Sequence, residues 1–134
     1  AITDVNHIIR FPTNWDTFLE NYDMFKRISD NQMLFSVTIQ AMNLPVIDDL
    51  VEFFPNDRFI LNELHYPDIL HINSLKPKVI ADVKAKTKLP KVKKMCEAYQ
   101  YNANENIKLQ QYLQELDTKR NTSSPTYMPW CYAR

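Results

Sequence analysis

The stretch MLFSVTIQAMNLPVIDDLVEFFPNDRFILNELHYPDILHINSLK, from Met33 to Lys76, predicts a strand, a helix and a second strand. A β-rich run from 33 to 40 leads through Asn43-Leu44-Pro45 into a helical run that ends at Phe54, and a second β-rich run covers 58 to 65. Two strands joined by one short helix should be parallel, because the chain must cross back before it can pair again. The stretch therefore predicts an α/β fold whose chemistry lies at the carboxyl ends of its strands.

Side chains alternate along the first predicted strand, so that its two faces differ in polarity. One face carries Met33, Phe35, Val37 and Ile39, and the other carries Leu34, Ser36, Thr38 and Gln40. The first face is typical of a core. The second becomes more polar toward its end, which suits a barrel interior or a pocket. Polar side chains also follow the strand ends, at Gln40, Asn43, His65 and Tyr66.

Helices are predicted on both sides of this stretch. Asn14 is a suitable N-cap for an amphipathic helix from Trp15 to about Ile28. After a short extended piece at 69–72, Pro77 begins another helix, and two further helical runs cover 91–101 and about 103–119. The Asn102, Asn104 and Asn106 series either interrupts the last two or only lowers the helicity of one long helix.

The chain divides into two parts that we expect to form one compact unit. Residues 1–88 hold the predicted strands and their helices, and residues 89–134 form a helical extension with an irregular tail from Asn121. Trp130 and Tyr132 are expected to anchor this tail against a neighbouring surface. A lysine-rich run between 84 and 94 has no interleaved aromatic residues or arginines, which favours a solvated helix junction over a nucleic-acid patch.

Composition and charge are those of a single globular domain. The 134 residues are 45% hydrophobic and 24% charged, and sixteen basic residues balance sixteen acidic ones. We therefore expect no recruitment of nucleic acid or anionic membranes. No apolar run reaches the roughly 20 residues that span a bilayer, and no secretory signal is visible at the N-terminus. We expect a cytoplasmic protein. Two free thiols at Cys96 and Cys131 are favoured over a disulfide.

The chain contains no glycine. This excludes a phosphate-binding loop, a glycine-rich dinucleotide motif and a serine nucleophile elbow. Turns that need a positive φ must use Asn or Asp instead. Candidate positions for such turns are Asn31, Asn43, Asn56, Asn73, Asn102 and Asn121.

Three motifs, in this order, resemble the second half of radical S-adenosylmethionine proteins, especially the twitch-type proteins common in bacteria and tailed phages. The first is Ile8-Ile9-Arg10-Phe11-Pro12-Thr13-Asn14-Trp15, and the second is Phe35-Ser36-Val37-Thr38-Ile39-Gln40-Ala41-Met42-Asn43. The third is Leu61-Asn62-Glu63-Leu64-His65-Tyr66-Pro67-Asp68-Ile69-Leu70, continuing from Ile72 to Pro77, and a late Leu116-Asp117-Thr118-Lys119-Arg120-Asn121 accompanies it.

The resemblance implies a partial, half TIM-like barrel in which this chain supplies the fifth and sixth strands, with Ala1 just after the fourth. The family binds a [4Fe–4S] cluster through a Cys-x3-Cys-x2-Cys loop and holds the cofactor's methionine part with a glycine-rich segment, and this sequence has neither. Where a family glycine is expected after Arg120, it has Asn121. We therefore expect no cofactor on this chain alone, and S-adenosylmethionine with the cluster only if a partner half supplies the cluster loop.

The resemblance also implies a set of cofactor-binding residues. Arg10 matches an arginine that reaches the carboxylate of S-adenosylmethionine, which suits a guanidinium fork. Thr38, Gln40 and Asn43 match a strand end beside the adenosine, and His65 and Tyr66 match the next strand end near the adenine. Each has a structural alternative: a surface arginine, solvent-exposed polar groups with Asn43 capping a helix, and a histidine that only donates or accepts a structural hydrogen bond.

No catalytic or metal-binding residue is predicted. Glu63 and Asp68 lack a partner for paired-carboxylate catalysis, and His7, His65 and His71 lack a zinc-type spacing. The main hypothesis is a split or truncated C-terminal half of a radical S-adenosylmethionine protein, which is not catalytic alone and needs an N-terminal partner. The alternative is a stand-alone binding or structural α/β remnant that self-associates and has no cofactor. A phage gene is one possible source of such a remnant. A third is a small α/β domain with accidental similarity.

Overall fold

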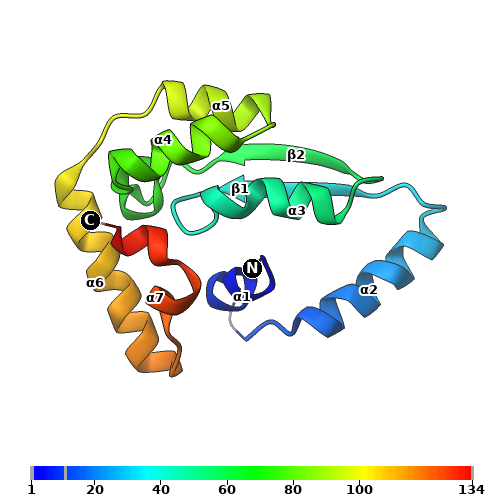
Figure 1. The fold of residues 1–134 in the computed structure, drawn as a ribbon. Helices are drawn as coiled ribbons and strands as arrows, with labels where there is room; N and C mark the ends of the chain where they lie inside the picture. Colours follow the sequence, from blue (N-terminus) through cyan, green and yellow to red (C-terminus); the bar gives the residue numbers. More distant parts are fainter. Residues whose placement is uncertain (1, 11, 134) are drawn as a thin grey trace.

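The computed structural model describes residues 2–10 and 12–133. Ala1, which was expected just after the fourth strand, and Phe11, which belongs to the first motif, lie outside the described residues. Figure 1 shows the elements in chain order, with α-helices labelled α and 3-10 helices η: α1 (Ile2–Ile9), α2 (Trp15–Ile28), β1 (Leu34–Ile39), η1 (Leu44–Val46), α3 (Ile47–Phe53), β2 (Arg58–Glu63), η2 (Asp68–Leu70), η3 (Ile72–Ser74), α4 (Pro77–Lys86), α5 (Pro90–Glu97), α6 (Ala103–Arg120), α7 (Ser124–Tyr127) and η4 (Pro129–Tyr132).

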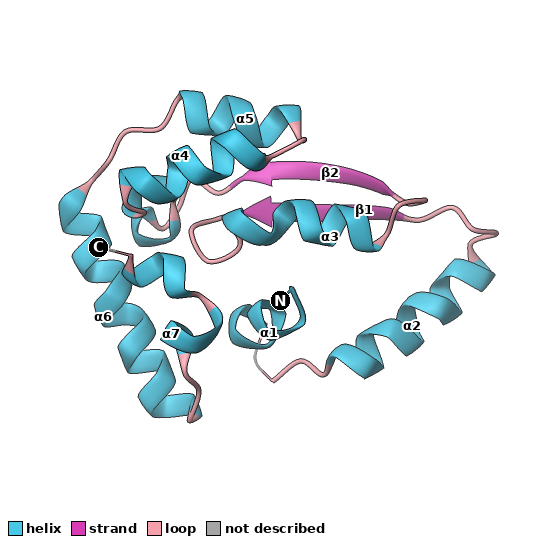
Figure 2. Cartoon of the chain, in the orientation of Figure 1, coloured by secondary structure: helices cyan, strands magenta, loops and turns pink. Residues whose placement is uncertain are grey.

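β1 and β2 form a two-stranded parallel sheet in register from Leu34↔Arg58 to Ile39↔Glu63. Helix α3 makes the crossover between them, which confirms the parallel prediction (Figure 2). Both strands end earlier than predicted, so Gln40 and His65 lie beyond the ladder. The fold is mixed α/β, and helices make up most of it.

The two faces of the sheet are buried to different degrees, as the alternation predicts. The Phe35 ring lies 4.9 Å from Phe54, at the end of α3, and 5.1 Å from Phe59 on β2, so the apolar face packs beneath the crossover helix. The opposite face is exposed, with Leu34 at 53% and Ile60 at 47% of their full accessible surface. This open face consists of Leu34, Ser36, Thr38, Arg58, Ile60 and Asn62.

Helix α2 begins where predicted, because the Asn14 side chain accepts hydrogen bonds from the N–H groups of Asp16 and Thr17. None of its residues is fully buried, although the Trp15 ring lies 5.7 Å from the Phe53 ring of α3. The Tyr22 hydroxyl donates a 2.5 Å hydrogen bond to Asp57, and burial together with this bond raises the pKa of Tyr22. These contacts attach α2 to the turn after α3.

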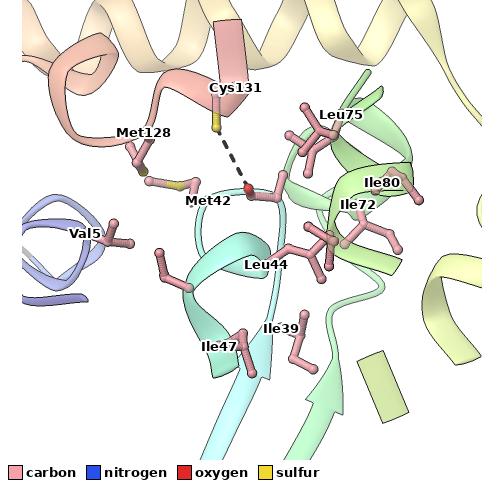
Figure 3. Packing of buried hydrophobic residues seen from close by; sticks show 14 of the residues in the cluster. Val5, Ile39, Met42, Leu44, Ile47, Ile72, Leu75, Ile80, Met128 and Cys131 are labelled. Atoms are coloured by element: carbon pink, nitrogen blue, oxygen red, sulfur yellow. Dashed lines mark hydrogen bonds between the residues drawn. The ribbon is translucent and has the colours of Figure 1, made fainter. Parts of the chain in front are cut away.

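One hydrophobic cluster of buried residues joins the two predicted parts of the chain (Figure 3). Fully buried residues come from α1, β1, η1 and η3 and also from α5, α6 and η4; among them are Val5, Ile39, Leu44, Ile72, Val92, Leu109 and Cys131. Trp130 anchors the tail as predicted, since its indole N–H donates to the Ala41 carbonyl at 3.1 Å. Cys96 and Cys131 are buried free thiols.

The predicted extended piece at 69–72 is wrong. Two 3-10 turns occupy this region, closed by bonds from His71 N–H to the Asp68 carbonyl and from Leu75 N–H to the Ile72 carbonyl. The residues are apolar because Ile72 enters the core, at 1% exposure, and not because they extend a sheet. Within the described residues, no helix is long and apolar enough to cross a lipid bilayer.

Asparagine replaces glycine at some of the turns but not at all of them. Asn31 and Asn121 adopt positive φ values of 61° and 51°. By contrast, Asn102 has a φ of −121° and caps α6, accepting a hydrogen bond from the Glu105 N–H. The asparagine series therefore separates the two predicted helical runs, since α5 ends at Glu97 and α6 begins at Ala103 after the Asn102 cap.

Candidate functional site

A cavity of about 450 Å³ lies beside the free edge of β1, and we call it the β1-edge cavity. Its polar lining consists of Asn6, Arg10, Thr13, Ser36, Thr38, Gln40 and Asn43. Its apolar lining consists of Val5, Ile9, Trp15, Phe18, Phe35, Val37, Ile47 and Leu50. The cavity thus has a mixed lining, in which the apolar residues supply contact area and the polar ones can orient a small molecule.

Gln40 supplies the clearest sign of a ligand position. Its side-chain oxygen, Oε1, is buried and has no hydrogen-bond partner among the described residues. A buried acceptor without a donor costs about 1–3 kcal/mol, so native proteins leave few of them. A ligand that donates an N–H or O–H to this oxygen would remove that cost.

Asn43 has a structural role that the sequence did not suggest. Its side-chain oxygen accepts from the Gln40 N–H at 2.9 Å, and its side-chain nitrogen donates to the Thr38 carbonyl at 3.0 Å. In a parallel sheet, each residue bonds in the same way to the residues on either side of its partner in the neighbouring strand. Its N–H donates to the residue before the partner, and its carbonyl accepts from the residue after it. The Asn43 carboxamide therefore stands in for a neighbouring strand opposite Ile39 and makes no side-chain cap to η1.

Asn43 closes the sheet edge only at its carboxyl end. The Leu64 N–H donates to the Ile39 carbonyl, so the backbone groups of Ile39 face β2, and those of Ser36 and Thr38 face the other way. No other strand in the described part of the chain pairs with this edge. The cavity is therefore bordered by backbone groups that can accept a further strand.

Arg10 lines the cavity and directly follows α1. Its side chain is exposed, and no carboxylate within the described ranges pairs with it. Its carbonyl accepts hydrogen bonds from the backbone and side chain of Thr13, which fixes the turn between α1 and α2. A guanidinium at this position is available for a carboxylate or phosphate of a ligand.

The structure brings Arg10, Thr38, Gln40 and Asn43 together but leaves His65 and Tyr66 outside the cavity lining. Both follow the end of β2 and are exposed, and Tyr66, at 86%, precedes a cis peptide bond to Pro67. His65 instead lies near Glu63 and His71.

The sequence predictions missed the contribution of α1. Val5, Asn6 and Ile9 line one side of the cavity, yet no helix was predicted for this segment. The apolar spacing of Val5, Ile8 and Ile9, at i, i+3 and i+4, was the available signal.

A larger cavity of about 780 Å³ lies between α3, α4 and η4, and part of its polar lining makes contacts within the protein. The Asp48 carboxylate accepts from the Thr87 hydroxyl and the Lys88 N–H, both at 2.8 Å. The Lys88 ammonium group pairs with Glu52 at 3.2 Å. These contacts hold α3 to the loop after α4, so we regard the smaller β1-edge cavity as the candidate site.

Comparison with protein families, curated proteins and solved structures yields no match for this chain. No family is thereby assigned.

Proposed function

We propose that this chain forms one wall of an α/β barrel of the radical S-adenosylmethionine type, and that the β1-edge cavity takes the cofactor. The observation that carries the proposal is the cavity itself, where Arg10 and Thr38 accompany the unpartnered Gln40 oxygen. The motif resemblance also selects Arg10, Thr38, Gln40 and Asn43, although His65 and Tyr66, which it implies as well, lie outside the cavity lining.

Each polar residue has a role that its environment supports. Gln40 Oε1 accepts an N–H or O–H of the adenosine, because it lacks any other donor among the described residues. Arg10 binds the carboxylate of the amino-acid part through its guanidinium fork. Asn43 is a positioning residue, since both ends of its carboxamide are engaged with the β1 backbone.

The open face and the free edge support the half-barrel part of the proposal. In a barrel, one face of every strand points inward while helices cover the other face. Here α3 packs on the apolar face of the sheet, and the polar side chains of Ser36, Thr38 and Asn62 lie on the opposite face. The remaining strands would come from sequence outside these 134 residues, on the same polypeptide or on another.

The cysteines of this chain do not fit an iron–sulfur cluster. Cys131 is completely buried, and burial raises the pKa of its thiol to about 12, whereas cluster ligands are thiolates. Burial also raises the pKa of Cys96. The cluster ligands must be supplied from elsewhere, so the chain alone is not catalytic. The cofactor supplies radical chemistry when it is bound.

A co-expression experiment tests the proposal. The chain is produced together with the segment encoded immediately upstream of it and purified without oxygen. We expect a brown, iron-containing complex that cleaves S-adenosylmethionine under reducing conditions. A colourless complex, no complex, or an upstream segment without the three-cysteine loop would refute the split-enzyme proposal.

A Gln40→Met variant separates ligand binding from folding. Methionine fills a similar volume without the buried oxygen, so the free energy of unfolding should stay within about 1 kcal/mol or rise. The affinity of the complex for S-adenosylmethionine should fall about tenfold, which is one lost hydrogen bond. Equilibrium dialysis measures the affinity, and Gln111→Met, at an exposed position of α6, is the control. Equal affinity in the two variants contradicts the role of Gln40.

One observation favours the second candidate, a self-associating binding module. Helix α2 exposes Met24 at 45%, Phe25 at 55% and Ile28 at 74%, and it extends from the body of the protein (Figure 1). Such an apolar surface is typical of an interaction site. Light scattering on the purified chain distinguishes the candidates: a stable, colourless oligomer supports the module, whereas a monomer rules out self-association.

A further inference from the structure

Three side chains with metal-binding atoms meet where β2 ends. They are Glu63, the last residue of β2, His65, two residues later, and His71, which precedes η3. One ligand atom from each lies within 4.8 Å of the others. Their spacing along the chain has no zinc-type pattern, so only the fold brings them together.

Two of these residues already hold their ligand atoms close to the separation that two ligands of one metal ion have. The His71 Nε2 atom lies 3.1 Å from Glu63 Oε1. In a tetrahedral zinc site with bonds of about 2.0–2.2 Å, neighbouring ligand atoms are roughly 3.3–3.5 Å apart. The pair therefore spans one edge of such a tetrahedron. Both side chains are mostly shielded from solvent, with 19% and 26% exposure.

His65 can complete the set with a small movement. It is exposed, and no hydrogen bond or ion pair engages its ring within the ranges that the structure describes. Its ligand atom lies within 4.8 Å of those of Glu63 and His71, so only a small rotation of this side chain is needed to bring it to the tetrahedral edge. Its exposed position also leaves the fourth side of the tetrahedron open to water.

The His71 ring makes a second hydrogen bond, and this bond determines which ring nitrogen carries the hydrogen before a metal ion binds. Its Nδ1 atom accepts from the Asn73 N–H at 3.1 Å, so the ring hydrogen is on Nε2 and is donated to Glu63. A metal ion that takes the Nε2 lone pair forces the ring hydrogen onto Nδ1. The Asn73 N–H then loses its acceptor, which gives metal binding a specific spectroscopic signature.

We propose that Glu63, His65 and His71 form a binding site for Zn²⁺, with water in the fourth position. Two imidazoles and one carboxylate are ligands that suit zinc and other late first-row metals, whereas Mg²⁺ and Ca²⁺ prefer sets made only of oxygens. The site joins the end of β2 to η3. It is separate from the β1-edge cavity, whose lining includes none of the three residues.

Calorimetric titration of the tag-free, chelator-treated chain with Zn²⁺ tests the proposal. We expect one saturable site per chain, and Zn²⁺ should raise the melting temperature, because it binds the folded state. His65→Ala and Glu63→Gln should each weaken binding by about tenfold or more. Glu63→Gln keeps an oxygen that accepts the His71 Nε2–H. A weaker affinity for Zn²⁺ in this variant would therefore not result from the loss of the hydrogen bond between residues 63 and 71. His7→Ala, outside the cluster, should bind as the unsubstituted chain does.

Backbone amide NMR supplies an independent measurement. At a Zn²⁺ concentration that just saturates the unsubstituted chain, the Asn73 amide resonance should shift fully in that chain and only in part, or not at all, in the His65→Ala chain. The proposal is overturned if the unsubstituted chain shows no saturable binding, or if His65→Ala keeps an affinity within tenfold of it. Neither outcome bears on the Gln40 experiment, so the two proposals stand or fall separately.

Discussion

Replacement of Leu109 by alanine is expected to lower the free energy of unfolding by about 2–5 kcal/mol, because it leaves a cavity in a fully packed core. Leu109 lies on α6 at 0% exposure. It belongs to the same cluster as Ile39 and Leu44, which come from the sheet region. Urea unfolding followed by far-UV circular dichroism measures the change.

The same experiment tests whether residues 89–134 are a separate extension. Since the core is shared, Leu109→Ala should shift one cooperative transition of the whole chain. The fluorescence of Trp15, isolated in a Trp130→Phe background, should shift by the same amount as the dichroism signal. Ile107→Ala is the control, since Ile107 is on the same helix at 56% exposure and should change stability by no more than about 0.5 kcal/mol. Transitions that separate would contradict the single core.

The strand–helix–strand unit could be predicted because local pattern and topology agree. Alternation along residues 34–39 defines the buried face, and the short crossover leaves only parallel pairing. The 3-10 turns at 68–74 could not be predicted in the same way. Ile69 and Ile72 favour strands by propensity, but the burial of Ile72 in the core overrides that preference.

The candidate site was predictable where it depends on one strand end. Thr38, Gln40 and Asn43 are close in sequence, so they remain close in any fold that keeps β1, and Arg10 joins them through α1 and the turn at Thr13. The cluster of Glu63, His65 and His71 depends instead on how η2 and η3 return toward β2. No spacing rule contains that information, because the turns between these residues follow from core packing.

The role of Asn43 illustrates the same limit. An asparagine before a proline-containing turn predicts a helix cap, since both N-cap and turn positions favour this residue. The observed bonds go backward to the strand edge. Which of the two occurs depends on whether the edge is already paired, and that is a property of the sheet as a whole.

Substitution of Asp117 by asparagine is expected to destabilise the fold by about 1.5–3 kcal/mol at neutral pH, which is typical of hydrogen bonds to a charged group. The Asp117 carboxylate, near the end of α6, accepts from the N–H and hydroxyl of Ser124 and from the Thr122 hydroxyl. Ser124 begins α7, so this one carboxylate fixes the turn between the last two α-helices. An amide nitrogen in place of one oxygen would face the Ser124 donors without being able to accept.

The pH dependence of this effect follows from the direction of the pKa shift. Burial alone would raise the pKa of Asp117, but the hydrogen bonds from Ser124 and Thr122 outweigh it and lower the pKa below the ordinary value of 3.8. A carboxyl whose pKa is lower in the folded state contributes stability above its unfolded pKa and loses it as the pH falls through the folded pKa. The difference in unfolding free energy between the unsubstituted chain and Asp117→Asn should therefore be constant near neutral pH. It should shrink below about pH 4 and be smallest in strong acid.

Urea unfolding across this pH range measures the difference, and Glu115→Gln, at an exposed position of the same helix, is the control. A difference that stays the same in strong acid would mean that the charge of Asp117 is not what orders the turn.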